Sequence, residues 1–264
     1  MPKVRDIVSY FTALVPPEMK MDFDNVGLLV GINDAEVRKA VIALDITDEV
    51  IDEAVRADAQ IILSHHPLYF DLKQVSDDSL IGKKIVKMLS CGISGFCQHT
   101  NLDAVPGGVN DVLAEKLDVR AEGWLEGPLF TSDGREYGMG RYGHLSSPIE
   151  FDDYLRMVQS SLKANGLRYH YAGTPVYRVA LCGGSGGEFI EQAIKLGCDT
   201  LVTADVKYDR FLAARELNLN LIDADHFSTE NVIVPVLAEM LKKGFPEIEA
   251  IVSSSHCASA KFYN

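Results

Sequence analysis

Histidine and carboxylate residues gather in three short polar clusters, each of which follows an apolar run. In the first, His65 and His66 adjoin each other directly after the apolar residues 61–63, and the other clusters occupy residues 99–103 and 225–230. Histidine is the commonest metal-binding side chain, and carboxylates complete many two-metal sites. These residue types therefore indicate metal chemistry, although each cluster taken alone is more typical of a turn with solvated side chains.

The third cluster has a spacing that favours a helix. His226 and Glu230 are four residues apart, which places both side chains on one helical face if Asp225 is the N-cap. If Ser228 is the cap instead, His226 lies on the preceding loop. Either placement leaves the two side chains near each other. Pro235 in the apolar run that follows predicts a kink or the first turn of a new helix.

The elements that position these clusters alternate between strand and helix in the first half of the chain. Helical spacing of apolar residues predicts a helix over residues 4–15, and Thr47 is the expected cap of a second helix. Short apolar, β-branched runs predict strands. The expected strands are 40–45, 61–63 and 93–97, and a further helix is expected over 81–89. This alternation is typical of a largely parallel sheet covered by helices.

The second half repeats this order and sets the expected domains. Residues 179–203 can be laid beside residues 41–64, strand for strand and helix for helix, with a polar segment near a histidine at the end of each half. A shift in composition places the boundary near residue 125, which predicts lobes at 1–125 and 126–264. Two related lobes facing each other would bring the polar segments to one cleft.

Two local features are expected near and beyond that boundary. Pro148 is expected to introduce a helix, and the glycine-rich residues 183–187 a tight turn between a strand and a helix. The backbone amides of such a turn could hold a phosphate. However, the residues lack the lysine of a P-loop and the last glycine of a dinucleotide fingerprint, so a plain turn is the favoured interpretation.

Composition narrows the class of protein. The chain has 264 residues, 47% of them hydrophobic, and no run approaches the roughly 18 apolar residues of a membrane span. The amino terminus lacks the pattern of a signal peptide, and the five cysteines form no CxxC pair, so a cytoplasmic protein with buried thiols is expected. A net charge of −13 without a basic run opposes general binding to nucleic acid.

Four motifs in order resemble one family across nearly the whole chain. They are residues 24–28 (Asp-Asn-Val-Gly-Leu), 64–67 (Ser-His-His-Pro), 99–103 (His-Thr-Asn-Leu-Asp) and 226–230 (His-Phe-Ser-Thr-Glu). They are similar to those of the Nif-three-like family, also labelled GTP cyclohydrolase 1 type 2. Members often have Trp where this chain has Phe23, and the tail at residues 253–257 also departs from the expected ending.

The resemblance implies a fold, an assembly and a ligand set. The fold would be two interlinked, related α/β lobes, with mixed sheets flanked by helices and a two-metal site in the cleft between them. The assembly would be a ring-like homohexamer. The metal ligands carried over would be His65, His66 and Asp103 from the first lobe and His226 and Glu230 from the second.

The chemistry expected of that ligand set is hydrolysis. Nitrogen and oxygen ligands suit two divalent transition-metal ions per chain, zinc, iron or manganese, which lower the pKa of water and polarise the bond attacked. The implied reaction is the opening of the guanine imidazole ring of GTP, with a nucleotide-like substrate and His99 as proton carrier. His99 is equally compatible with a role in supporting a ligand. The alternatives are a metal-dependent phosphoesterase or nucleotide hydrolase, and a non-catalytic metal-binding scaffold or interaction protein.

Overall fold

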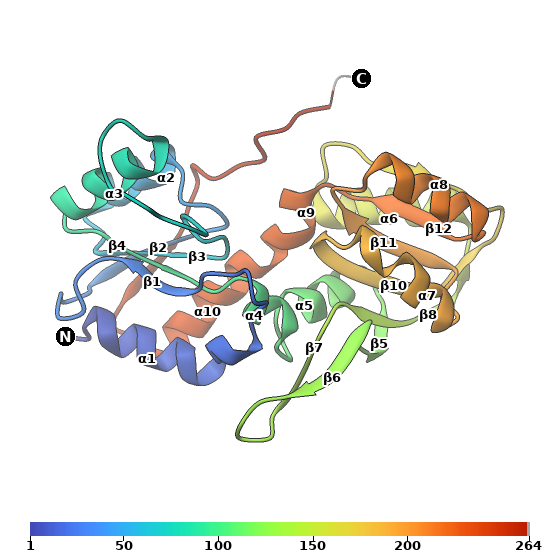
Figure 1. Ribbon diagram of the computed structural model, residues 1–264, viewed down its shortest axis with the longest axis horizontal. Helices are drawn as coiled ribbons and strands as arrows, with labels where there is room; N and C mark the ends of the chain where they lie inside the picture. Colours follow the sequence, from blue (N-terminus) through green and yellow to red (C-terminus); the bar gives the residue numbers. More distant parts are fainter. Residues whose placement is uncertain (263–264) are drawn as a thin grey trace. The chain divides into compact units, whose positions relative to one another are not determined.

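The computed structural model describes residues 1–262, and the chain divides into two compact units. Unit 1 contains residues 1–102 and 233–257, and unit 2 contains residues 103–232 and 258–262 (Figure 1). The chain therefore leaves unit 1, builds most of unit 2 and returns to unit 1. This division differs from the expected boundary near residue 125, and the assignment of lobes to residues 1–125 and 126–264 stays a prediction.

The sheet of unit 1 has five strands in the order β1-β4-β3-β2-β13. Strands β2, β3 and β4 are parallel neighbours, β13 joins β2 in parallel, and β1 is antiparallel to β4. The bounds are β1 (Gly27–Val30), β2 (Lys39–Ala43), β3 (Ile61–Ser64), β4 (Ser94–Cys97) and β13 (Glu249–Val252). Because the parallel strands end at one edge of the sheet, the residues that follow β2, β3 and β4 lie close together.

Helices cover both faces of this sheet. Helices α2 and α3 lie on one side of it and α1 and α10 on the other (Figure 1). Thr47 caps α2, as expected, by accepting a hydrogen bond from the backbone amide of Val50. The bounds are α1 (Val4–Leu14), η1 (Pro17–Met19), α2 (Asp48–Ala57), α3 (Leu80–Ser90), α4 (Thr100–Ala104) and α10 (Val234–Gly244). Pro235 lies in the first turn of α10, which resolves the choice between a kink and a helix start.

The sheet of unit 2 has six strands in the order β5-β8-β10-β11-β12-β9. Strands β10, β11 and β12 are parallel neighbours, like β2, β3 and β4, while β8 and β9 are antiparallel to β10 and β12. The bounds are β5 (Arg120–Gly123), β8 (Arg141–Ile149), β9 (Arg168–His170), β10 (Val176–Ser185), β11 (Thr200–Ala204) and β12 (Asn220–Asp223). Both units are thus mixed α/β layers, which confirms the expected fold class.

Alternate residues of the central strands of unit 2 build two cores. Val179 and Leu181 of β10 pack in one core with α5 and α6, and Ala180 and Cys182 pack in the other with α7 and α8. This is the two-residue period of a strand buried on both faces. The remaining helices are α5 (Val109–Lys116), α6 (Phe151–Leu162), η2 (Gly187–Phe189), α7 (Ile190–Lys195), α8 (Tyr208–Glu216), α9 (His226–Glu230) and η3 (Asn231–Ile233).

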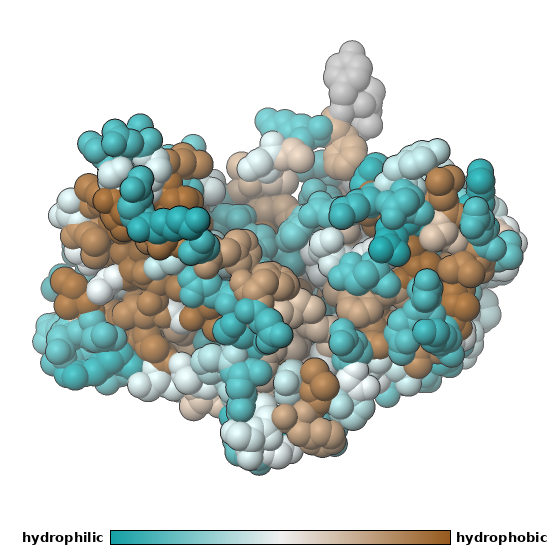
Figure 2. Space-filling view, viewed as in Figure 1, coloured by the Kyte–Doolittle hydropathy of each residue, from teal (hydrophilic) through white to brown (hydrophobic). Residues whose placement is uncertain are grey.

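A two-stranded hairpin, β6 (Glu126–Phe130) and β7 (Glu136–Met139), extends from unit 2 (Figure 1). It carries exposed apolar side chains, Leu129 and Phe130, and Figure 2 shows hydrophobic surface where Figure 1 draws the hairpin. Most of the hairpin therefore lies on the surface, and Met139 at the end of β7 packs against the core that contains α7 and α8.

Two local expectations differ from the structure: the helix expected after Pro148 is present as α6 but starts later, and the expected glycine-rich turn was wrong. Pro148 lies inside β8, and the helix after it begins only at Phe151, because this end of β8 pairs with the start of β10 through Ile149 and Val176. The glycine-rich residues 183–185 belong to β10 and are not a turn. In both places the pairing of β10 with its neighbours outweighs the local turn signal.

Two observations bear on the class of protein. Within residues 1–262, no helix has the length and apolar character needed to cross a lipid bilayer. The five cysteines are free thiols, and Cys97, Cys182 and Cys198 are buried as expected, whereas Cys91 and Cys257 are exposed.

Candidate metal centre

Three imidazoles form a cluster at the edge of the unit 1 sheet where its parallel strands end. His65 and His66 follow β3 directly, and His99 follows β4, the neighbouring parallel strand. One ligand atom of each histidine lies within 4.8 Å of the others. His99 lies 33 residues after His66 in the chain, and the pairing of β3 with β4 brings the two side chains together. The three side chains have the arrangement that can hold a metal ion.

Each of these imidazoles has its Nδ1 atom directed at an oxygen acceptor. Nδ1 of His65 lies 2.9 Å from the backbone carbonyl of Gln98, and Nδ1 of His66 lies 2.7 Å from the Asp45 carboxylate. An acceptor at Nδ1 requires the proton there, so in the neutral ring Nε2 keeps its lone pair. Metal-binding histidines are commonly oriented in this way.

His99 is held in the same manner by Asp24. Its Nδ1 lies 2.8 Å from Asp24 Oδ1, and the other carboxylate oxygen accepts hydrogen bonds from the backbone amide and hydroxyl of Thr100. Burial raises the pKa of Asp24, but the hydrogen bonds from His99 and Thr100 outweigh it and lower the pKa to about 2. Asp24 is therefore ionised at neutral pH and fixes the orientation of the His99 ring.

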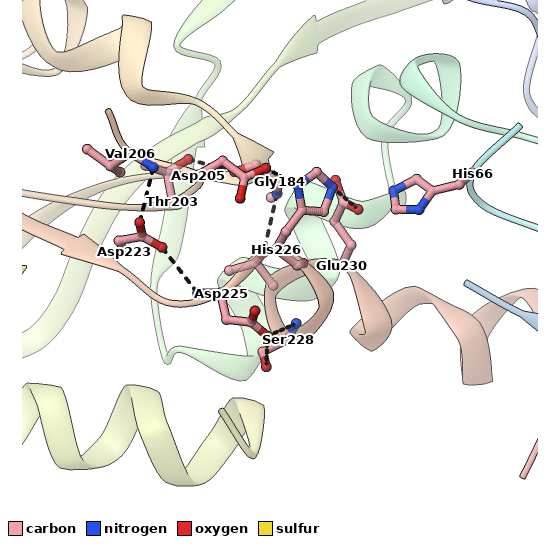
Figure 3. A network of polar contacts seen from close by, with 12 residues as sticks. His66, Gly184, Thr203, Asp205, Val206, Asp223, Asp225, His226, Ser228 and Glu230 are labelled. Atoms are coloured by element: carbon pink, nitrogen blue, oxygen red, sulfur yellow. Dashed lines mark hydrogen bonds and ion pairs between the residues drawn. The ribbon is translucent and has the colours of Figure 1, made fainter. Parts of the chain in front are cut away.

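In unit 2, helix α9 carries His226 and Glu230. Asp225 is the N-cap, because its side chain accepts a hydrogen bond from the Ser228 amide, and the helix begins at His226 (Figure 3). This settles the choice between the two possible caps. His226 and Glu230 accordingly lie on one helical face, as the spacing of four predicts.

His226 is placed between two carboxylates. Its Nδ1 lies 2.7 Å from Asp205 Oδ2, and its Nε2 lies 2.9 Å from Glu230 Oε2 (Figure 3). Two ligand atoms that bind one ion at about 2.1 Å and at roughly a right angle are about 3 Å apart. The spacing of Nε2 and Oε2 therefore fits two neighbouring ligands of a single ion.

Asp103 is a buried residue of α4 and the first residue of unit 2. Its backbone carbonyl accepts a hydrogen bond from Asn110 Nδ2, and Asn110 Oδ1 accepts one from the Gly183 amide, which ties α4 to β10. Burial raises the pKa of the Cys182 thiol well above its usual value, and the charges of Asp103 and Glu230 raise it further. The Asp103 and Glu230 carboxylates thus both lie near the buried Cys182 thiol.

The backbone of β10 approaches α9 closely at Gly184. Its φ is +63°, and a Cβ there would lie 2.2 Å from Glu230 Oε1. Its amide also donates to Thr229 Oγ1, and its carbonyl accepts from Thr203 Oγ1. A residue without a side chain is therefore required for Glu230 to occupy its place.

The residues that orient the imidazoles, Asp24, Asp45 and Asp205, were missed as site residues. The chain does contain a signal for two of them. Asp45 precedes His66 by 21 residues and Asp205 precedes His226 by 21 residues, and in each pair the aspartate follows one parallel strand and the histidine the next. Asp24 belongs to the recognised 24–28 motif, but only the structure pairs it with His99.

The chain is similar to known proteins over most of its length. It is 35% identical over 258 residues to a Clostridium perfringens protein named GTP cyclohydrolase 1 type 2 homolog, covering 95% of this chain and 96% of the relative. A Streptomyces coelicolor protein with the same name is 32% identical, covering 87% of this chain and 82% of the relative.

Solved structures and a family description agree with these relatives. A Bacillus cereus protein related to NIF3 matches with a TM-score of 0.91 and 25% identity, covering 100% of this chain and 99% of that structure. Residues 2–258 match the family described as Duf34/NIF3 (NGG1p interacting factor 3). With its imidazoles and carboxylates at the ends of parallel strands, the chain therefore belongs to the Duf34/NIF3 family.

Proposed function

We propose that this protein is a dinuclear metal-dependent hydrolase of the GTP cyclohydrolase type, which opens the imidazole ring of the guanine base of GTP. Two divalent transition-metal ions, zinc, iron or manganese, would be held by His65 and His66 from unit 1 and by Asp103, His226 and Glu230 from unit 2. The protein would act in the cytoplasm.

The observation that carries this proposal is the shared orientation of the imidazoles. His65, His66 and His226 each have an oxygen acceptor at Nδ1, which leaves Nε2 as the ligand atom of the neutral ring. His226 Nε2 and Glu230 Oε2 have the spacing of neighbouring ligands. Nitrogen and carboxylate oxygen donors suit zinc, iron or manganese better than calcium or magnesium.

Divalent ions at such ligands lower the pKa of water toward neutrality and polarise the bond under attack. His99 supplies the proton transfer that ring opening needs. Its ring centroid lies 5.2 Å from that of His65 and 5.5 Å from that of His66, and Asp24 holds its Nδ1, so Nε2 is the atom that takes up or gives a proton.

The names of the curated relatives support GTP as the substrate to test first. The Clostridium and Streptomyces proteins are both named GTP cyclohydrolase 1 type 2 homolog. The proposal transfers that reaction to this chain.

The experiment combines elemental analysis with product detection. Purified protein should contain close to two transition-metal ions per chain and release formate from GTP. His65→Ala and Glu230→Gln should lose metal and turnover while staying folded, whereas His170→Ala, a histidine of β9, should keep both. Native protein without metal that takes none up after chelation would end the proposal. Phosphate release without formate would assign a phosphoesterase instead.

The same measurements distinguish a proton carrier at His99 from a metal ligand at His99. His99→Gln should keep the metal content and lose about 10² to 10⁴ in turnover, as expected for loss of a general acid or base. Loss of metal in this variant would instead make His99 a ligand of the unit 1 cluster.

The proposal includes a homohexamer. Light scattering of the purified full chain should then give a mass close to six times 29.0 kDa. A mass of one or two chains would contradict the proposed hexamer. It would not bear on the metal proposal, which is tested by the elemental analysis.

A further inference from the structure

Two exposed phenylalanines lie beside the imidazole cluster of unit 1. Phe23 is 64% exposed and Phe70 is 54% exposed, and their ring centroids are 6.1 Å apart. The Phe70 ring centroid lies 5.7 Å from that of His99, which in turn lies 5.5 Å from that of His66. A continuous row of rings therefore leads from solvent to the proposed metal ligands. Adjoining exposed phenylalanines expose apolar area that a ligand can cover.

The loops that carry these two rings are fixed by hydrogen bonds. Asn25 Nδ2 donates to the Tyr69 carbonyl at 3.0 Å, which ties the loop of Phe23 to the loop of Phe70. The Tyr69 hydroxyl donates to the Leu29 carbonyl of β1, and Lys20 Nζ donates to the Asp24 carbonyl, both at 2.8 Å. The backbone that carries the two rings is thus held in place before any ligand arrives, which lowers the entropy cost of binding.

The geometry of the pair decides how a planar ligand can bind. A ring inserted between two others needs parallel planes and two contacts of about 3.5 Å each. Phe23 and Phe70 are inclined by 52° at a centroid distance of 6.1 Å, so they contact each other and leave no space for a third ring. A planar group must therefore lie on an outward face of this platform and not between its two rings.

We propose that Phe23 and Phe70 form a stacking platform for the purine base of a nucleotide substrate and place that base next to His99. The inference rests on the proposed function, because it identifies how the same site recognises the base. Stacking on aromatic side chains recognises any planar heterocycle, and proximity to the cluster presents the base to the residues that act on it.

The test compares a ligand that has a base with one that lacks it. Rapid filtration of the metal-loaded full chain with radiolabelled ligand, read before turnover, should show tighter binding of GTP than of inorganic tripolyphosphate. Phe70→Ala and Phe23→Ala should each raise the Kd of GTP about tenfold or more and leave the Kd of tripolyphosphate unchanged. Phe70→Trp should keep GTP affinity. Phe130→Ala, which removes an equally exposed ring of the β6 hairpin, is the matched control and should change neither Kd.

Metal content and formate release, measured on the same samples, separate this inference from the proposed function. Unchanged GTP affinity in the Phe23→Ala, Phe70→Ala double variant overturns the platform, even if metal and turnover are intact. If the double variant changes the mass of the assembly and leaves GTP affinity unchanged, the platform is also overturned. That result would assign the two rings to a protein interface. Base-dependent binding by a protein that takes up no metal would support the platform and contradict the hydrolase.

Discussion

At the scale of single residues, the same device occurs once in each unit. An aspartate after one parallel strand holds Nδ1 of a histidine after the next, as Asp45 holds His66 and Asp205 holds His226, each at 2.7 Å. The aspartate selects the tautomer and the direction of the ring and makes the imidazole a better donor. Each proposed ligand would therefore be oriented by a residue that need not contact the ion.

Removing the charge of either aspartate should weaken metal binding without removing a ligand. We expect Asp205→Asn and Asp45→Asn each to lower metal affinity about 10- to 100-fold, the usual effect of losing a group that orients a ligand. Competition with a chromophoric chelator measures the affinity. Asp34→Asn, which breaks a surface ion pair with Lys3 and Arg5, is the control and should leave the affinity unchanged. Equal affinity in all three variants would show that the aspartates do not support ligands.

At the scale of elements, β10 and α9 pack together around Glu230. The strand extends through residues 183–185, and its backbone gives the helix polar contacts at Thr229 and steric room at Glu230. The glycine-rich sequence thus has a packing explanation that does not need a phosphate.

Adding a methyl group at Gly184 should disturb the site more than the fold. Gly184→Ala places a Cβ 2.2 Å from Glu230 Oε1 and 3.2 Å from His226 Cε1, in addition to a left-handed φ that costs about 1–2 kcal/mol. We expect metal affinity to fall at least tenfold by the chelator assay. Gly187→Ala is the control, because its Cβ would meet only Arg210 at 3.4 Å or beyond. Equal metal affinity in both variants would contradict the close approach to Glu230.

A second contact between elements holds the C-terminal segment of unit 1 to α2. The Glu53 carboxylate accepts hydrogen bonds from the hydroxyls of Ser253 and Ser254 and from the amides of Ser254 and Ser255. Burial raises the pKa of Glu53, but these hydrogen bonds outweigh it and lower the pKa from 4.5 to about 2. The contact therefore needs the ionised carboxylate.

This depressed pKa predicts a pH-dependent stability. Because the folded-state pKa lies below the unfolded value, the contribution of Glu53 is fully present above about pH 4.5 and is lost as the pH falls toward 2. Glu53→Gln should lower the free energy of unfolding at pH 7 by about 1–2 kcal/mol, allowing for partial exposure. Urea unfolding should show this difference shrinking at pH 3. Glu249→Gln, which removes an exposed partner of Lys39, should cost less than about 1 kcal/mol and is the control.

At the scale of the whole molecule, the proposed ligands come from both units of a chain that passes between them. Residues 233–257 return to unit 1 after unit 2 is built, and β13 pairs with β2 at the edge of its sheet. Metal binding to ligands of both units would stabilise the native chain as a whole, because the unfolded chain does not hold those ligands together.

Chelation should therefore lower the melting temperature of the wild-type protein. A free metal concentration 100 times its Kd stabilises by about 2.7 kcal/mol, which corresponds to a change in Tm of roughly 5–10 °C for a chain of this size. Differential scanning calorimetry with and without chelator measures it. His65→Ala should melt near the chelated wild type and respond little to chelator. A wild-type Tm that is independent of metal would contradict binding to the native state.

The sequence by itself determined what depends on neighbours along the chain. The helix cap at Thr47 follows from a side chain that reaches the amide three residues ahead, and the parallel strands follow from short β-branched runs. The choice of Asp225 over Ser228 as the cap of α9 came only from the structure. The spacing of His226 and Glu230 likewise placed both on one helical face. The family motifs could also be recognised from the sequence, because each lies within five consecutive residues.

Only the tertiary structure decided which distant residues meet. The pairings of Asp45 with His66, Asp205 with His226 and Asp24 with His99 depend on which strands are neighbours and where each strand ends. The same holds for Pro148, which lies in β8 because that strand pairs with β10. Local spacing carries no information on such partners, since the free energy that selects them comes from strand pairing and core packing across the fold.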